Sequence, residues 1–276
     1  MLTIVSIDVH QIKTVVWPKI YFSNTVHSKI HIGTSGWSYK HWRGVFYPRT
    51  LAASKWLGFY TGVFATTEVN GSFYRLPTAE TVKKWAEAVP DEFLFCPKMS
   101  RYLTHMKKLR EPEEPLERFF SVFHFMQEKI GPVLIQLPPM LLFNYEVAEH
   151  FYRLLKMNYR DYDFVIEVRH ATWLQEKSLT LMTAYDIGFV ISQSNQVFPY
   201  AEVVTAKNIY VRFHGPADLY ASSYSDEALK SYAEKFIAWV KEGHEVWAYF
   251  NNDIHGHATK DAIRLLHLLE KYEEQH

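Results

Sequence analysis

Residues 164–169 read Phe-Val-Ile-Glu-Val-Arg, and this short stretch indicates what kind of fold the chain adopts. Successive side chains of a β-strand point to opposite faces, so Val165, Glu167 and Arg169 share one face and the three other apolar residues share the other. In an α/β protein the apolar face of a strand packs against helices. We therefore expect the charged face of this strand to point into the interior of a curved sheet.

The same alternation recurs at residues 209–214, Ile-Tyr-Val-Arg-Phe-His, which places Tyr210, Arg212 and His214 on the inward face. Five further strands give inward sets in the same register: His31, Gly33 and Ser35; Glu68 and Asn70; Leu94, Cys96 and Lys98; Leu134 and Gln136; and Trp247, Tyr249 and Asn251. In these strands the polar members gather at the carboxyl end. That end carries the active site in enzymes built on (β/α)8 barrels.

Eight β-like runs begin near residues 30, 65, 93, 132, 164, 189, 209 and 246. Their spacing, about 30 residues, is that of a strand and its returning helix. Helical patterns are clearest over 78–88, 116–129, 146–157, 226–241 and 257–270, and residues 194–207 show none. We predict a single TIM-type (β/α)8 barrel with parallel strands over residues 30–272. Residues 1–29 lack the pattern and are predicted to be an N-terminal extension outside the core fold.

The composition restricts the class of protein. Of the 276 residues, 48% are hydrophobic and 16% aromatic, which excludes a disordered chain. The 30 basic and 30 acidic side chains give no net charge, so a strongly basic nucleic-acid binder is excluded and any anion site must be local. The sequence has no apolar run of membrane-spanning length and one cysteine, Cys96. We expect a cytoplasmic protein without membrane association.

Several motifs in order resemble the domain-of-unknown-function 72 family, also called YecE-like. They are Gly33-Thr34-Ser35-Gly36-Trp37, Glu68-Val69-Asn70 with Ser72-Phe73-Tyr74, Lys98 with Thr104-His105, Gln136-Leu137-Pro138-Pro139, Glu167-Val168-Arg169-His170 with Trp173, Arg212-Phe213-His214-Gly215, and Tyr249-Phe250-Asn251-Asn252-Asp253 with Gly256 and Ala258. Gly71 departs from the family, which commonly has a small hydroxyl residue there. The resemblance implies a single TIM-type barrel, and it brings no reaction with it.

Glu68, Glu167 and Lys98 are the predicted catalytic residues. The two glutamates end different strands, so they face each other across the barrel mouth and could divide acid and base roles. The alternative is that both are paired with the cations Lys98, Arg169 and Arg212 in a structural network.

The predicted substrate-binding residues are Asn70, Tyr74, His105, Gln136, Arg169, Arg212, His214, Asn251 and Asp253. Arginines converging on one end of the barrel, before a helix whose free amides favour anions, indicate a subsite for a phosphoryl or similar group. We expect Arg212→Ala to weaken anion binding by ~1.5–3 kcal/mol. Its stability should stay level or rise, unless Glu167 depends on the arginine.

Metal binding is weakly indicated. Asp253, His255 and His257 form an alternating row, but the last of them is expected to begin a helix, and no paired His or Cys spacing occurs. We predict no metal and no cofactor.

The function that these residues favour is an enzyme with glutamate acid/base chemistry on a small phosphorylated or otherwise anionic substrate. Its reaction class, whether hydrolase, lyase or isomerase, is left open. One alternative is a metal-dependent phosphoesterase or isomerase similar to endonuclease IV or xylose isomerase. The other is a non-catalytic module that binds nucleotides or nucleic acid.

Overall fold

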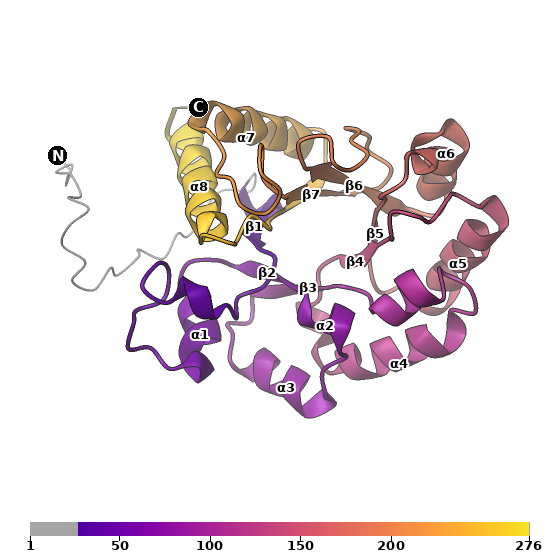
Figure 1. The fold of residues 1–276 in the computed structure, drawn as a ribbon, viewed down its shortest axis with the longest axis horizontal. Coiled ribbons are helices and arrows are strands. Elements are labelled where there is room, and N and C mark those ends of the chain that lie inside the picture. Colours follow the sequence, from indigo (N-terminus) through magenta and orange to yellow (C-terminus); the bar gives the residue numbers. More distant parts are fainter. Residues whose placement is uncertain (1–26, 276) are drawn as a thin grey trace.

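The structure, a computed structural model, describes residues 27–275 and has its strands at the centre with the helices outside them (Figure 1). The strands are β1 (Ile30–Thr34), β2 (Thr66–Val69), β3 (Leu94–Pro97), β4 (Val133–Gln136), β5 (Phe164–Glu167), β6 (Ile187–Gln193), β7 (Asn208–Phe213) and β8 (Glu245–Phe250). Six of them form one curled sheet in the order β1-β8-β7-β6-β5-β4, and β2 pairs with β3. All of these pairs are parallel, as predicted.

The helices are α1 (Trp56–Tyr60), α2 (Gly71–Tyr74), α3 (Ala79–Glu87), α4 (Glu113–Phe123), α5 (Tyr145–Asn158), α6 (Glu176–Ala184), α7 (Asp226–Lys241) and α8 (His257–Gln275). Short 3-10 turns lie at His27–Lys29, Lys40–Trp42, Ala53–Lys55, His124–Lys129 and Ala171–Leu174, and a π turn lies at Tyr102–Met106. Four of the five predicted helices are confirmed, and 194–207 contains none. The helix predicted over 116–129 ends at Phe123, and the 3-10 turn His124–Lys129 follows it. Three helices have a side-chain N-cap, which accepts a hydrogen bond from the backbone amide three residues further on. The caps are Thr78 for α3, Asn144 for α5 and Ser225 for α7.

The predicted inward faces are confirmed. A small cluster inside the strands consists of Cys96, Leu134, Val165, Val190, Tyr210, Trp247 and Tyr249. The opposite faces of the same strands, such as Ile166 and Val211, join the larger core under the helices. The side-chain alternation of each strand therefore separates two apolar layers and carries polar residues inward.

The structure differs from the predicted continuous ladder of eight strands. Strand pairing is interrupted at two places, between β3 and β4 and between β1 and β2. Between β3 and β4 only isolated bridges join the strands, at Phe95–Ile130 and Lys98–Leu134. The Met99 amide donates to the Leu134 carbonyl. Because alternate residues of a strand direct their amides to the same side, the odd-numbered residues from 95 to 99 direct theirs at β4. Pro97 belongs to that series and has no N–H, which removes a ladder bond.

Between β1 and β2 a tyrosine hydroxyl takes the place of direct pairing. The Thr34 amide donates to the Tyr60 hydroxyl at 3.0 Å, and that hydroxyl donates to the Thr66 carbonyl at 3.1 Å. The described fold is thus an α/β fold with a curled six-stranded parallel sheet, half of a barrel, and a separate parallel pair, covered by helices.

The close approach of β1 and β2 leads to a stability prediction at Gly33. A Cβ at this position would lie 2.2 Å from the Thr66 carbonyl oxygen, which is backbone and cannot rotate away. We expect Gly33→Ala to lower the free energy of unfolding by about 1–3 kcal/mol, measured by urea denaturation. Gly71→Ala is the matched control, because nothing lies within 4 Å of a Cβ there. Equal effects of the two substitutions would contradict the close approach.

The predicted extension at residues 1–29 falls outside the described residues, except for the turn His27–Lys29 that precedes β1. The boundaries of 30 and 272 stay a prediction. No helix in the described part of the chain is long and apolar enough to cross a membrane.

Candidate functional site

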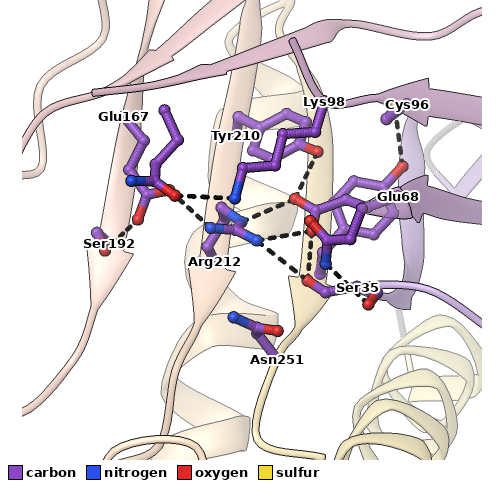
Figure 2. A network of polar contacts seen from close by, with 12 residues as sticks. Ser35, Glu68, Cys96, Lys98, Glu167, Ser192, Tyr210, Arg212 and Asn251 are labelled. Atoms are coloured by element: carbon purple, nitrogen blue, oxygen red, sulfur yellow. Dashed lines mark hydrogen bonds and ion pairs between the residues drawn. The ribbon is translucent and has the colours of Figure 1, made fainter. Parts of the chain in front are cut away.

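Arg212 lies at the centre of a buried group of charges at the carboxyl ends of the strands (Figure 2). Its Nε and Nη2 donate to the two carboxylate oxygens of Glu68 at 2.8 and 2.9 Å, and its Nη1 donates to Glu167 Oε2 at 2.6 Å. The Arg212 side chain is 1% exposed and both carboxylates are fully buried. We call this group the carboxyl-end cluster: Glu68, Lys98, Glu167, Arg169, Arg212 and His214.

Glu68 receives two further hydrogen bonds. The hydroxyl of Ser35, directly after β1, donates to Oε2, and the Tyr210 hydroxyl on β7 donates to Oε1 at 2.9 Å. Four donors thus surround one buried carboxylate, which offsets the free energy that its removal from water costs.

Glu167 is the common partner of two arginines, one histidine and one hydroxyl. Its Oε1 accepts from Ser192 at 2.9 Å and lies 2.7 Å from Arg169 Nη2 and 2.9 Å from His214 Nε2. Burial alone would raise the pKa of this carboxyl, but Arg169, Arg212 and His214 outweigh burial and hold the pKa well below its usual range. Glu167 is therefore an anion throughout the neutral range.

His214 is held as a neutral imidazole in one tautomer. Asn251 Nδ2 donates to His214 Nδ1 at 3.1 Å, so the ring proton lies on Nε2, which donates to Glu167. Burial lowers the pKa of His214 to about 4, with the nearby arginines adding to the effect and Glu167 opposing it. The histidine is fully buried and extends the hydrogen-bonded network from β7 to the end of β8.

Lys98 differs from the other cations of the cluster. It follows directly after β3, is 8% exposed, and donates from Nζ to Gln136 Oε1 at 2.8 Å. Its ammonium also lies 4.2 Å from the centre of the Phe73 ring. Among residues 27–275, no carboxylate oxygen lies within 4 Å of this nitrogen. Burial, followed by repulsion from Arg212, lowers the pKa of Lys98 to about 7 although Glu167 and Glu68 oppose the shift.

Arg169 and Asn70 present buried polar atoms that have no partner in the described structure. Arg169 stacks on the Phe198 ring, 3.3 Å from the ring centre, and its Nε has no acceptor. Asn70 donates from Nδ2 to the Ser35 carbonyl at 2.9 Å, while its Oδ1 has no donor. Unsatisfied buried donors and acceptors are uncommon in folded proteins, and they suit a ligand that completes their hydrogen bonds.

The remaining predicted residues lie at different distances from this cluster. His105 contacts Thr104 and the edge of Phe73, and burial followed by Lys98 lowers its pKa to about 4. Gln136 and Asn251 are half-buried partners of Lys98 and His214. Tyr74 is 81% exposed, and no contact joins it to the charged groups.

In the turn before α8, Asn251 contacts His214 of the cluster, whereas Asp253 contacts His41. Asp253 Oδ2 lies 3.6 Å from His41 Nε2, and burial raises the pKa of the aspartate. Asn252 is buried between the Ser222 carbonyl and Asp261. The contribution of this helix start to an anion subsite stays a prediction.

Ser35, Ser192, Tyr210 and Phe198 are site residues that sequence reasoning did not assign. Ser35 and Tyr210 were placed inward by strand alternation, which was a usable signal. Ser192 is the next-to-last residue of β6, where the predicted run was not divided into faces. Phe198 lies in a segment without helix or strand, so no periodicity could place it beside Arg169.

No three His, Cys, Asp or Glu side chains in residues 27–275 stand close enough together to hold a metal ion. The rings of His255 and His257 contact each other at 5.9 Å, and Asp253 is turned toward His41 instead. The metal-dependent alternative therefore has no ligand set in the described structure.

The fold and the cluster define a class: parallel α/β proteins that gather buried charges at the carboxyl ends of their strands. The family model described as "Protein of unknown function DUF72" matches residues 31–276, and the chain belongs to this family, as its motifs predicted.

Two curated relatives are similar over most of their length. The UPF0759 protein YunF of Bacillus subtilis is 25% identical over 271 residues, covering 87% of this chain and 95% of that protein. The UPF0759 protein YecE of Escherichia coli is 26% identical over 234 residues, covering 76% and 82%. A crystal structure of a DUF72 family protein from Thermotoga maritima superposes with a TM-score of 0.75 at 26% identity, covering 89% of this chain and 99% of that one.

Proposed function

We propose that this protein is an enzyme that binds a small anionic substrate at the carboxyl ends of its strands and uses Lys98 to transfer a proton. The observation that carries the proposal is the buried Lys98 amine without a carboxylate partner. An amine whose pKa is lowered to about 7 can both accept and release a proton near neutral pH.

The charge balance of the cluster favours an anionic substrate. Glu68 and Glu167 carry two negative charges, and Arg169 and Arg212 carry two positive charges, so these four cancel. Protonated Lys98 then leaves one positive charge in a poorly hydrated place. A phosphoryl or carboxylate group that accepts from Lys98 Nζ and Arg169 Nε would neutralise this charge and complete the hydrogen bonds of the arginine.

The two glutamates receive a positioning role in this proposal. Both are fully buried and paired with Arg212, and Glu167 stays ionised, so the proposal gives the proton transfer to Lys98 instead. They hold Arg212 and Arg169 in place and set the potential at Lys98. Of the three predicted catalytic residues, only Lys98 is assigned the proton transfer. Of the two arginines predicted to bind substrate, Arg169 is assigned the contact and Arg212 is not.

We also propose that the six-stranded sheet and the β2–β3 pair together close into one eight-stranded barrel. We further propose that the protein is cytoplasmic. Support for closure comes from the Tyr60 hydroxyl between β1 and β2, and from the Gly131 and Met99 amides that donate across the β3–β4 gap at 2.9 and 2.8 Å. Closure would hold all six cluster residues on one rigid rim. The buried free thiol of Cys96 is compatible with a reducing compartment.

Anion binding tests the proposal. Isothermal titration with sulfate, whose charge is constant across the neutral range, should show binding that weakens as pH rises through about 7, because Lys98 then loses its proton. Lys98→Met and Arg169→Gln should each weaken binding about ten- to a hundredfold, as expected for a hydrogen bond to a charged group.

Lys84→Met serves as the matched control, because Lys84 is an exposed lysine paired with Glu80 on α3. It should leave the sulfate affinity unchanged. An affinity that is the same in wild type and Lys98→Met, at every pH, would refute an anion site at this lysine.

A further inference from the structure

We infer that the Lys98 amine is a nucleophile that condenses with the carbonyl group of a small anionic aldehyde or ketone to form an imine on the enzyme. This inference rests on the proposed function and deepens it, because it names the substrate class. It also selects among the open reaction classes: an imine supports lyase or isomerase chemistry at the carbon next to the carbonyl.

The first support is the position of the nitrogen. The Lys98 side chain extends from the end of β3 toward Arg212, and Nζ ends among the cluster residues (Figure 2). Carboxyl ends of parallel strands are where such folds place their reacting groups. The residue is only 8% exposed, so the amine lies in a place largely shielded from bulk water.

The second support is the absence of a competing partner in the described structure. Every carboxylate oxygen of the cluster is already occupied, since Glu68 accepts from Arg212, Ser35 and Tyr210, and Glu167 accepts from Arg169, Arg212, His214 and Ser192. A lysine that serves only stability is usually paired with such an oxygen, because an unpaired buried charge is costly. Lys98 has instead the neutral oxygen of Gln136 and the face of the Phe73 ring.

The third support is the supply of free amine at neutral pH. Burial and the neighbouring Arg212 lower the pKa of Lys98 to about 7, so a large fraction of the amine is unprotonated. A lysine activated by desolvation and by an adjacent cation is the arrangement that imine-forming enzymes use. The titratable and charged groups facing it are Arg212 from β7, Glu68 from β2, Glu167 and Arg169 from β5 and its end, and His105 from the π turn after β3.

The chemical step balances without any oxidant or reductant. The lone pair of Nζ attacks the carbonyl carbon, the C=O π pair moves to oxygen, and one proton passes from nitrogen to oxygen to give a carbinolamine. A second proton, taken from the site, lets the hydroxyl leave as water while the nitrogen lone pair forms the C=N bond of a protonated imine. Neutral His105 contacts the same Phe73 ring as Lys98 does, and its imidazole can relay these protons between the amine and solvent.

Borohydride trapping tests the inference. Pyruvate and glyceraldehyde 3-phosphate serve as probes, because one carries a carboxylate directly on the carbonyl carbon and the other a phosphate ester two carbons away from it. Protein incubated with either probe and sodium cyanoborohydride should gain one reduced adduct, located at Lys98 by peptide mass spectrometry. The rate of trapping should rise with pH through about 7. The probe that reacts faster identifies the anionic group.

Two variants separate covalent chemistry from anion binding. Lys98→Arg keeps a cation and cannot form an imine, so it should bind sulfate within about tenfold of wild type and lose the adduct entirely. Lys84→Met should still give the adduct at wild-type rate. Circular dichroism confirms that each variant is folded.

The outcomes distinguish the two proposals. Sulfate binding that depends on Lys98, with no adduct at this residue from either probe, would overturn the imine and leave the proposed function standing. If sulfate binding does not depend on Lys98 and no adduct forms at this residue, both the proposed function and the imine are overturned. Adducts spread over exposed lysines, and equally abundant in Lys98→Arg, would also overturn the imine.

Discussion

Replacing Arg212 with methionine is expected to lower the free energy of unfolding by about 3–5 kcal/mol, the largest stability loss we predict for a single side chain. The substitution removes all cationic hydrogen bonds of Glu68 and one of those of Glu167, while both carboxylates stay fully buried. The sequence-based expectation was that stability would stay level or rise unless Glu167 depends on the arginine. The ion pair between Arg212 and the buried Glu167 meets that condition, so we expect a loss. Urea denaturation at neutral pH measures the loss.

The pH dependence of this loss has a definite sign. The folded-state pKa of Glu167 lies well below its unfolded value, so its stabilising contribution is present above the unfolded pKa of about 4.3 and is lost as pH falls below it. Removing Arg212 takes away part of this depression. The difference between wild type and variant should therefore shrink as the pH falls below that value.

Two control variants test whether the stability loss of Arg212→Met comes from leaving the buried glutamates without their partner. Arg153→Met removes an exposed arginine whose nearest carboxylate, Glu149, is 3.7 Å away, and it should change stability by about 0–1 kcal/mol. The double variant Glu68→Gln, Arg212→Met removes one charge of each sign and leaves Glu167 paired with Arg169, so it should recover part of the loss. A single Arg212→Met variant as stable as Arg153→Met would show that the glutamates do not need the arginine.

Replacing Lys98 with methionine is expected to have the opposite effect on stability and to abolish function. Methionine has a similar length and no charge, so burying it avoids the desolvation that the ammonium suffers. We expect the free energy of unfolding at pH 6 to rise by about 1–4 kcal/mol, while anion binding weakens and imine trapping disappears. A residue retained although it destabilises the fold is typical of an active site.

The pH profile identifies the source of this gain. The pKa of Lys98 is about 7 in the folded protein and about 10.4 in the unfolded chain. Below pH 7 both states are protonated and the cost is fully present. Between the two values the unfolded chain binds more protons, so wild-type stability gains on that of the variant as pH rises. A variant that is less stable than wild type at pH 6 would show that Lys98 is a structural cation.

Strand alternation predicted much of the site. Glu167, Arg169 and Arg212 were placed inward at the carboxyl ends of their strands from local spacing alone, and the structure brings them together. Local spacing could not identify Phe198 or the Pro97 and Tyr60 interruptions, because each depends on which neighbour a strand or loop meets.

The sequence by itself determined the eight strands, five of the eight α-helices described in residues 27–275, the inward faces of the strands, and the family. These follow from side-chain periodicity and from the order of the motifs, which depend only on local sequence. The tertiary structure alone decided how the charges pair. Glu68 and Arg212 are 144 residues apart in the chain, and no local pattern states that this arginine satisfies both glutamates. Because it does, Lys98 is left without a carboxylate in the described structure, and its chemistry follows from contacts that exist only once the strands have come together.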